Sequence, residues 1–161
     1  MKKILFVCSL VICAVILATS CTPKGSTDAQ LYFVDSSMQR LIPTDFTVDT
    51  SNKNKAAEKV IGELLKGRDK NDKILRIIPN VKNGLSVRIK NDTAIVNMSR
   101  EFVDKHSDLR QHEVLTIYQI VNSLTSIDGI LNVQFTIDNK ESKDFKGFCD
   151  MRETFIPDYY I

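Results

Sequence analysis

The stretch from Leu85 to Met98 limits the possible folds more than any other part of the sequence. Apolar side chains occupy alternate positions on both sides of Asn91-Asp92: Leu85, Val87 and Ile89, then Ala94, Val96 and Met98. Asn and Asp tolerate the positive φ angles of a two-residue β-turn. With these two residues as the turn, opposite positions share a face and all six apolar side chains fall on one side. The sequence therefore predicts a β-hairpin with one buried face, and it leaves apolar Ile95 on the polar outer face.

Two segments show helical spacing. Apolar residues recur on one face in the first: Ala56, Ala57, Val60, Ile61, Leu64 and Leu65. Capping residues 50–52 precede this segment and Gly67 ends it, which predicts an amphipathic helix. A wider apolar stripe over 113–124, closed by Asp128-Gly129, predicts a second helix that should be the most buried.

Three further segments have strand character. Leu31–Asp35 is rich in β-forming residues, and Arg40–Val48 is extended but contains Pro43, which cannot donate a hydrogen bond and should therefore lie on an edge. Residues 133–137 alternate as a last strand before the turn at Asp138-Asn139. The order of strand, helix, hairpin, helix and strand predicts an α+β fold, a small mixed sheet with two helices packed on one face.

The C-terminal region after residue 144 is rich in aromatic residues. It carries five of them: Phe145, Phe148, Phe155, Tyr159 and Tyr160. We expect most of them to fold back on the sheet. The alternative is an exposed aromatic surface that meets a partner.

The N-terminus carries an export signal. Lys2 and Lys3 precede an apolar run over 4–17, and small residues at 18–20 follow. This predicts a signal peptide over 1–20, because a membrane span needs about 20 apolar residues. The sequence from Leu17 to Cys21 resembles the bacterial lipobox, which implies cleavage before Cys21 and a diacylglycerol on its thiol. An ordinary signal peptide cut near Ser20 would instead give a soluble secreted protein.

Residues 21–30 contain no large apolar side chain, and we expect a flexible tether there, followed by a single domain over 31–161. The sequence has four cysteines. Cys8 and Cys13 would leave with the signal peptide and Cys21 would be acylated. Only Cys149 would remain, so we expect no intramolecular disulfide and a domain held by its core.

The charge pattern and the reactive residues indicate a protein that is not an enzyme. The formal net charge is +2 and there is no basic stretch, so we expect no nucleic-acid partner. His106 and His112 are six residues apart and do not have the spacing of a zinc pair, so a solvated loop is expected for both. No catalytic signature surrounds Cys149. The sequence predicts no catalytic, metal or cofactor site, and a cysteine-dependent enzyme is kept as a minor alternative.

Several pieces of the sequence, taken in their order and spacing, resemble the GerM domain of bacterial sporulation and spore-germination lipoproteins. The resemblance covers Leu31 to about Ile137 and rests on these segments: 31–35, 63–67 with Ile78-Pro79, 94–99 with Phe102, and 118–125 with Gly129 and Val133. Some members of the family carry two tandem copies of the domain, whereas this chain has one.

The resemblance implies a domain of the ring-building type, with an αββαβ core and an extra N-terminal strand. It also implies a scaffold or assembly factor of the cell envelope, acting in sporulation or germination. We expect the protein on the extracytoplasmic face of the cell membrane, held there by diacylglycerol on Cys21. Its expected partners are other envelope proteins or a second copy of the chain.

One surface is a candidate for partner binding. Ile95 is an apolar residue on a polar face, and the edge strand that contains Leu41 and Phe46 offers unpaired backbone groups. The alternative function is a binding module for cell-wall glycan or a small germinant. An exposed aromatic cleft within residues 145–160 would be its sign.

Overall fold

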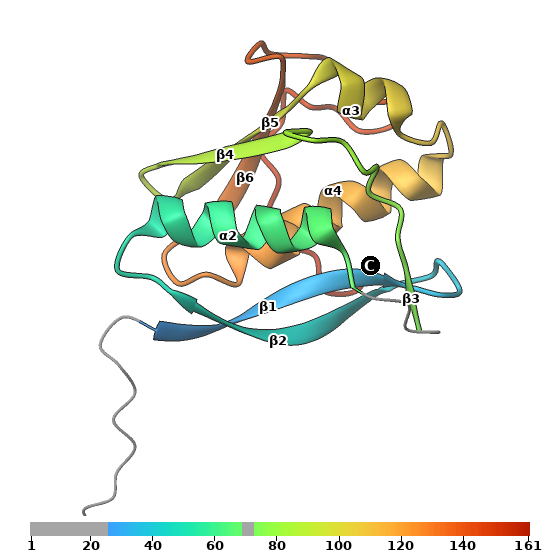
Figure 1. Cartoon of the computed structure of the whole chain (residues 1–161). Coiled ribbons are helices and arrows are strands. Elements are labelled where there is room, and N and C mark those ends of the chain that lie inside the picture. Colours follow the sequence, from blue (N-terminus) through green and yellow to red (C-terminus); the bar gives the residue numbers. More distant parts are fainter. Residues whose placement is uncertain (1–25, 69–72) are drawn as a thin grey trace, which may run out of the picture.

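The computed structural model describes residues 26–68 and 73–161, which form two three-stranded sheets with helices between them (Figure 1). One sheet has the strand order β2-β1-β3 and the other β4-β5-β6. The strands are β1 Ser26–Asp35, β2 Leu41–Asp49, β3 Ile74–Leu75, β4 Leu85–Lys90, β5 Thr93–Met98 and β6 Asn132–Ile137. The helices are α2 Lys53–Lys66, α3 Arg100–Lys105 and α4 Arg110–Thr125. The predicted signal peptide and Cys21 lie outside the described residues.

The predicted hairpin is confirmed with its register. Leu85 lies opposite Met98, and the turn residue Asn91 has φ +58°. Strand β6 runs parallel to β5, and α2 and α4 pack on the apolar face of this sheet. The order α2, β4, β5, α4 and β6 is the predicted αββαβ core, with the short helix α3 inserted before α4.

Both predicted helices form where the sequence indicates. The side chain of Asn52 caps α2 by accepting a hydrogen bond from the Lys55 N–H, and Gly67 ends the helix with φ +70°. Helix α4 is buried over most of its length. Its buried residues are Glu113, Leu115, Thr116, Ile117, Gln119, Ile120, Val121, Asn122, Ser123 and Leu124. None of the described helices has the length and apolar character that crossing a membrane would need.

The N-terminal segments form a second sheet that the sequence analysis did not separate from the first. Strands β1 and β2 pair antiparallel over their whole length, and β2 lies at the edge, as Pro43 predicted. Residues 21–25 lie outside the described residues, and residues 26–30 are strand rather than tether. These polar residues are ordered because Ser26 to Gln30 pair with Asp49 to Asp45, and because buried Ala29 faces the core.

Helix α4 closes the other edge of β1 with side-chain hydroxyl groups. The N–H of Tyr32 donates to Ser123 Oγ at 2.8 Å, and the N–H of Gln30 donates to Ser126 Oγ at 2.9 Å. The Ser126 hydroxyl in turn donates to the Gln30 carbonyl at 3.0 Å. Backbone groups that a neighbouring strand would otherwise satisfy are therefore satisfied by a helix.

The C-terminal segment binds the two sheets together around α4. Phe155 pairs with Val133 of β6, and the Asn122 side chain exchanges two hydrogen bonds with the Asp158 backbone. Of the five aromatic residues in this region, Phe145 is buried, Phe155 packs on the core and Tyr159 lies 5.8 Å from Tyr32 between ring centroids. Tyr159 is nevertheless 56% exposed, and Phe148 and Tyr160 are exposed as well. The expectation that most of these aromatic residues fold back is therefore wrong, because only Phe145 and Phe155 of the five pack on the core.

Candidate interaction surface

Ile95 lies on the outer face of the second sheet, as the hairpin register requires, between Arg88 and Gln134. Its side chain is only 8% exposed, because it forms the floor of a small hollow lined by polar neighbours such as Ser86 and Asn97. The sequence analysis expected Ile95 to be exposed, and this expectation is wrong. Long polar side chains from neighbouring strands can cover an isolated apolar one, which the strand pattern does not show.

The other two candidate residues also contribute to the interior. Leu41 is 8% exposed and packs with Tyr32 and Leu115. Phe46 is half-buried against the core, with the Lys59 ammonium 5.4 Å from its ring centroid. Their side chains therefore offer little free surface, and what β2 presents to solvent is mainly its backbone.

The open edge of β2 is confined to its second half. The Asp35 N–H donates to the Arg40 carbonyl, and backbone bonding alternates along an antiparallel strand. The backbone N–H and C=O groups of even-numbered β2 residues therefore bond to β1, and those of odd-numbered residues point away from it. Of the outward positions, Leu41 donates its N–H to the Ile161 carbonyl and Pro43 has no N–H. Protection of this kind is typical of edge strands. Among the described residues, nothing pairs with the outward side of the stretch from Asp45 to Thr47, which can therefore accept another strand.

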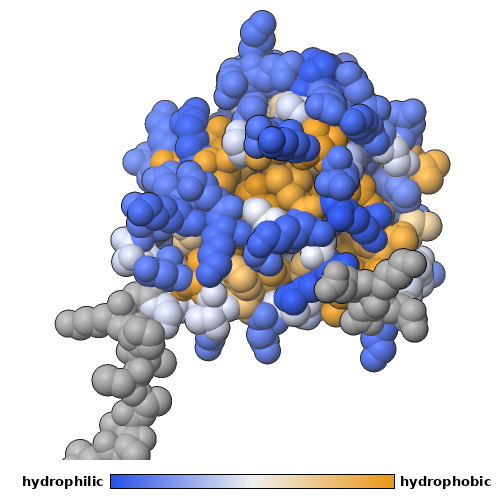
Figure 2. Space-filling model, viewed as in Figure 1, coloured by the Kyte–Doolittle hydropathy of each residue, from blue (hydrophilic) through white to orange (hydrophobic). Residues whose placement is uncertain are grey.

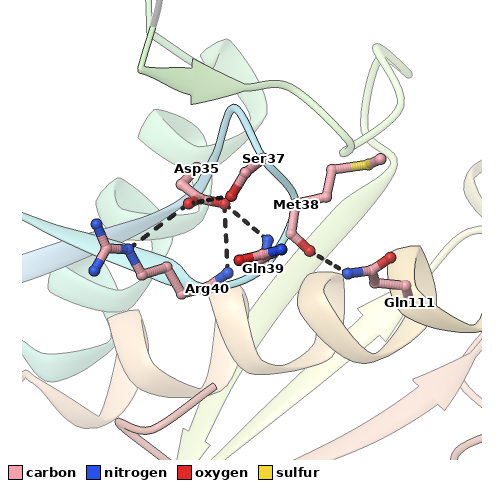
Figure 3. A network of polar contacts seen from close by, with 6 residues as sticks. All are labelled: Asp35, Ser37, Met38, Gln39, Arg40 and Gln111. Atoms are coloured by element: carbon pink, nitrogen blue, oxygen red, sulfur yellow. Dashed lines mark hydrogen bonds and ion pairs between the residues drawn. The ribbon is translucent and has the colours of Figure 1, made fainter.

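The turn between β1 and β2 is held by the carboxylate of Asp35 (Figure 3). This carboxylate accepts hydrogen bonds from Ser37 Oγ at 2.7 Å and from the Gln39 N–H at 2.9 Å, and it pairs with the Arg40 guanidinium at 3.7 Å. The hydrogen bond from Ser37, with those from the backbone, keeps the pKa of Asp35 below its ordinary value. The turn is thus fixed without a glycine.

Met38 occupies a backbone conformation that is unusual for its residue type. Its φ is +58°, in the left-handed region that a bulky side chain rarely adopts. Its carbonyl accepts a hydrogen bond from Gln111, and its sulfur lies 3.0 Å from His112 Nε2. The side chain lines a shallow hollow of about 500 Å³ with Leu115 and Ile161. Contacts to α4 therefore hold Met38 in this conformation at the far end of β1.

His106 is buried, contrary to the expected solvated loop. It is 3% exposed, and its ring nitrogens lie 2.9 Å from the Ser107 carbonyl and 2.9 Å from Thr116 Oγ1. Its ring packs 4.6 Å from that of Phe145. Burial lowers the pKa of His106 to about 4, so the ring is neutral at physiological pH. Long-range packing of the C-terminal region, which the local sequence does not show, places it inside.

Cys149 lies against a buried carboxylate. Glu113 is fully buried and accepts hydrogen bonds from the N–H groups of Cys149 at 2.8 Å and Phe148 at 3.3 Å. Burial, reinforced by the negative charge of Glu113, raises the pKa of the Cys149 thiol to about 12. Nucleophilic cysteines have lowered pKa values, so this arrangement does not favour a cysteine enzyme. The sequence analysis missed Glu113, whose only signal was an acid at the start of an apolar stripe.

Comparison with known proteins agrees with this architecture. The model of the Germane family, described as sporulation and spore germination, matches residues 30–143. No curated protein matches the sequence at a significant level.

Among solved structures, a candidate lipoprotein from Clostridium perfringens is 23% identical with a TM-score of 0.58, covering 86% of this chain and 93% of its own. The first GerMN domain of the sporulation protein GerM from Bacillus subtilis is 21% identical with a TM-score of 0.55, covering 75% of this chain and 90% of its own. The tandem GerMN domains of the same protein are 21% identical with a TM-score of 0.53, covering 74% of this chain and 42% of their own.

These structural similarities establish a shared fold. The match to the family model extends over most of the chain and is described by a developmental process rather than a catalytic activity. The chain therefore belongs to the Germane family, the GerM-domain proteins of sporulation and spore germination.

Proposed function

We propose that the protein is a lipid-anchored, non-enzymatic scaffold on the extracytoplasmic face of the cell membrane, and that it acts in sporulation or spore germination. The family match supports the process. The lipobox-like sequence that ends at Cys21 supports the anchor, and the similar fold of a candidate clostridial lipoprotein is consistent with it.

The anchor and the fold together give the scaffold an orientation. A diacylglycerol on Cys21 supplies two acyl chains, enough for stable attachment, and confines the domain to the membrane surface. Strand β1 begins at Ser26, five residues after Cys21, and five residues span at most about 18 Å. The turn at Met38 lies at the other end of this ten-residue strand, about 33 Å further along. The Met38 end is therefore the part of the sheet furthest from the anchor along β1.

One observation carries the scaffold role. The His106 ring and the Glu113 carboxylate are engaged in hydrogen bonds within the fold, and the Cys149 thiol has a raised pKa. Within the described residues, by contrast, the backbone of β2 from Asp45 to Thr47 has a neighbouring strand on one side only. An open edge can accept a strand from another protein through backbone hydrogen bonds. Partner capture at this edge is the most direct use of the structure.

Two experiments test the proposal. In Cys21→Ser the thiol is lost, and the protein should leave the membrane fraction while its domain stays folded; retention in that fraction would contradict the anchor. In Thr47→Pro an outward N–H is removed, whereas the matched control Thr47→Ala keeps it. Affinity purification from sporulating cells should lose its envelope partner with Thr47→Pro alone. Recovery of wall glycan instead of a protein would favour the alternative binding module.

A further inference from the structure

A second open sheet edge lies beside α2. In the described part of the chain, β4 pairs only with β5, so its other side is free. Lys90 and Thr93 flank the two-residue turn and form a hydrogen-bonded pair, so Leu85, Val87 and Ile89 direct their N–H groups outward. The bond from the Ile89 N–H to Asn54 Oδ1, at 2.8 Å, agrees with this alternation and closes one end. The stretch from Leu85 to Val87 remains open.

The open edge forms one wall of a groove. The groove holds about 270 Å³ between β4 and α2, and its lining residues are Glu58, Ile61, Gly62, Leu65, Leu85, Ser86 and Val87. Figure 2 shows apolar surface in the centre of this face, with polar side chains around it. An added strand on β4 would therefore place its inward side chains over Ile61 and Leu65 of α2.

Gly62 leaves the α2 side of the groove without a side chain at this position. A glycine within a helix costs about 1 kcal/mol relative to alanine, so its presence in the middle of α2 calls for a reason. Internal packing does not supply one, because a Cβ added at Gly62 would meet nothing within 4 Å. The missing side chain leaves space in the groove that a ligand can use.

The charge of the groove indicates its occupant. Glu58 is the charged residue that lines it, and it forms no ion pair with another described residue. A ligand with a Lys or Arg beside Glu58 would therefore be favoured. The β2 strand of a second copy carries the carboxylates of Asp45 and Asp49 and no Lys or Arg, so it offers no opposite charge to Glu58.

We propose that this groove binds an extended segment of another protein, which adds to β4 as a strand, places apolar side chains on α2 and carries a basic residue opposite Glu58. The backbone of Leu85 to Val87 would supply the pairing, and the apolar floor and Glu58 would supply the selectivity. This goes beyond the scaffold proposal, which concerns β2. Its failure would leave the Thr47 experiment unaffected.

The test uses a phage-displayed library of random heptapeptides against the full chain purified from membranes in mild detergent. Enriched peptides should carry alternating apolar residues and a Lys or Arg. Gly62→Leu should weaken their binding at least about tenfold, whereas the matched control Gly62→Ala should change it less than about twofold. Both variants raise helix propensity, so a loss confined to Gly62→Leu cannot come from unfolding. Glu58→Lys should weaken binding most at low salt.

Hydrogen exchange gives an independent readout of the pairing. A selected peptide should slow exchange of the Val87 amide, which points outward, and leave the Arg88 amide, which already faces β5, unchanged. Three outcomes would overturn the proposal: no enriched peptide, equal binding by the two Gly62 variants, or no added protection at Val87. Dimerisation of the chain through this groove, detected by sedimentation and abolished by Gly62→Leu, would also overturn it, since the occupant would then be a second copy.

Discussion

The stability of the domain should fall between pH 7.5 and pH 5 because of one buried side chain, His106. The ring is 3% exposed, and its pKa in the folded protein is about 4. In the unfolded chain the pKa of a histidine is about 6.5. Over this pH range the unfolded state therefore takes up a proton at His106 and the folded state does not. The contribution of the neutral His106 ring to stability is fully present above pH 6.5 and is lost as the pH falls toward 4.

The size of the effect follows from these two pKa values. At pH 5 the unfolded histidine is almost fully protonated, whereas only about a tenth of the folded molecules carry the proton. The linkage relation then gives a loss of about 2 kcal/mol in the free energy of unfolding between pH 7.5 and pH 5. Carboxyl groups with ordinary pKa values near 4 contribute little above pH 5, so this pH window separates the effect of histidine from that of the carboxyl groups.

Urea denaturation at the two pH values measures this loss. His106→Gln should be less stable than the wild type at pH 7.5, because the ring leaves its contacts with Phe145 and Thr116, but its stability should hardly change down to pH 5. His112→Gln keeps the buried His106 ring, so it is the comparison variant and should still lose stability toward pH 5. The reasoning is refuted if His106→Gln retains the same loss, or if the wild type shows none.

Three further predictions follow from the polar contacts. Glu113→Ala leaves the N–H groups of Phe148 and Cys149 without their acceptor, so it should cost about 2–4 kcal/mol in urea denaturation and speed alkylation of the Cys149 thiol at pH 8; unchanged alkylation would contradict the contact. Ser123→Ala removes the acceptor of the Tyr32 N–H and should cost about 1–3 kcal/mol, whereas Ser123→Thr should restore most of this if the hydroxyl is what matters. Asp35→Ala should lower the melting temperature more than Asp35→Asn, which keeps one acceptor for the turn; equal effects would argue against the network in Figure 3.

Local patterns in the sequence predicted the elements whose structure is set locally. The hairpin around Asn91 combines alternating apolar residues with turn residues, and both features specify the same register. Helix α2 combines apolar spacing with a cap at Asn52 and a stop at Gly67. Where periodicity and end signals agree, the prediction succeeded.

Elements that depend on distant contacts were missed. The β1–β2 turn has none of the usual hairpin residues, since the Asp35 carboxylate and contacts to α4 hold Met38 in place. Polar residues 26–30 form a strand because β2 and Ser126 satisfy their backbone groups. Glu113 lies 36 residues from Cys149, whose N–H it accepts, so neither the burial of Glu113 nor this hydrogen bond could be inferred from nearby sequence.

The central claim, a membrane-anchored scaffold with an open edge on β2, is tested most directly by site-specific photo-crosslinking. A photoreactive residue is placed at Thr47 of the full-length protein, and crosslinked partners are identified by mass spectrometry in growing and in sporulating cells. The account predicts capture of an envelope protein during sporulation that is lost in Cys21→Ser. Capture that is unchanged by Cys21→Ser, or no protein captured at either stage, would contradict it.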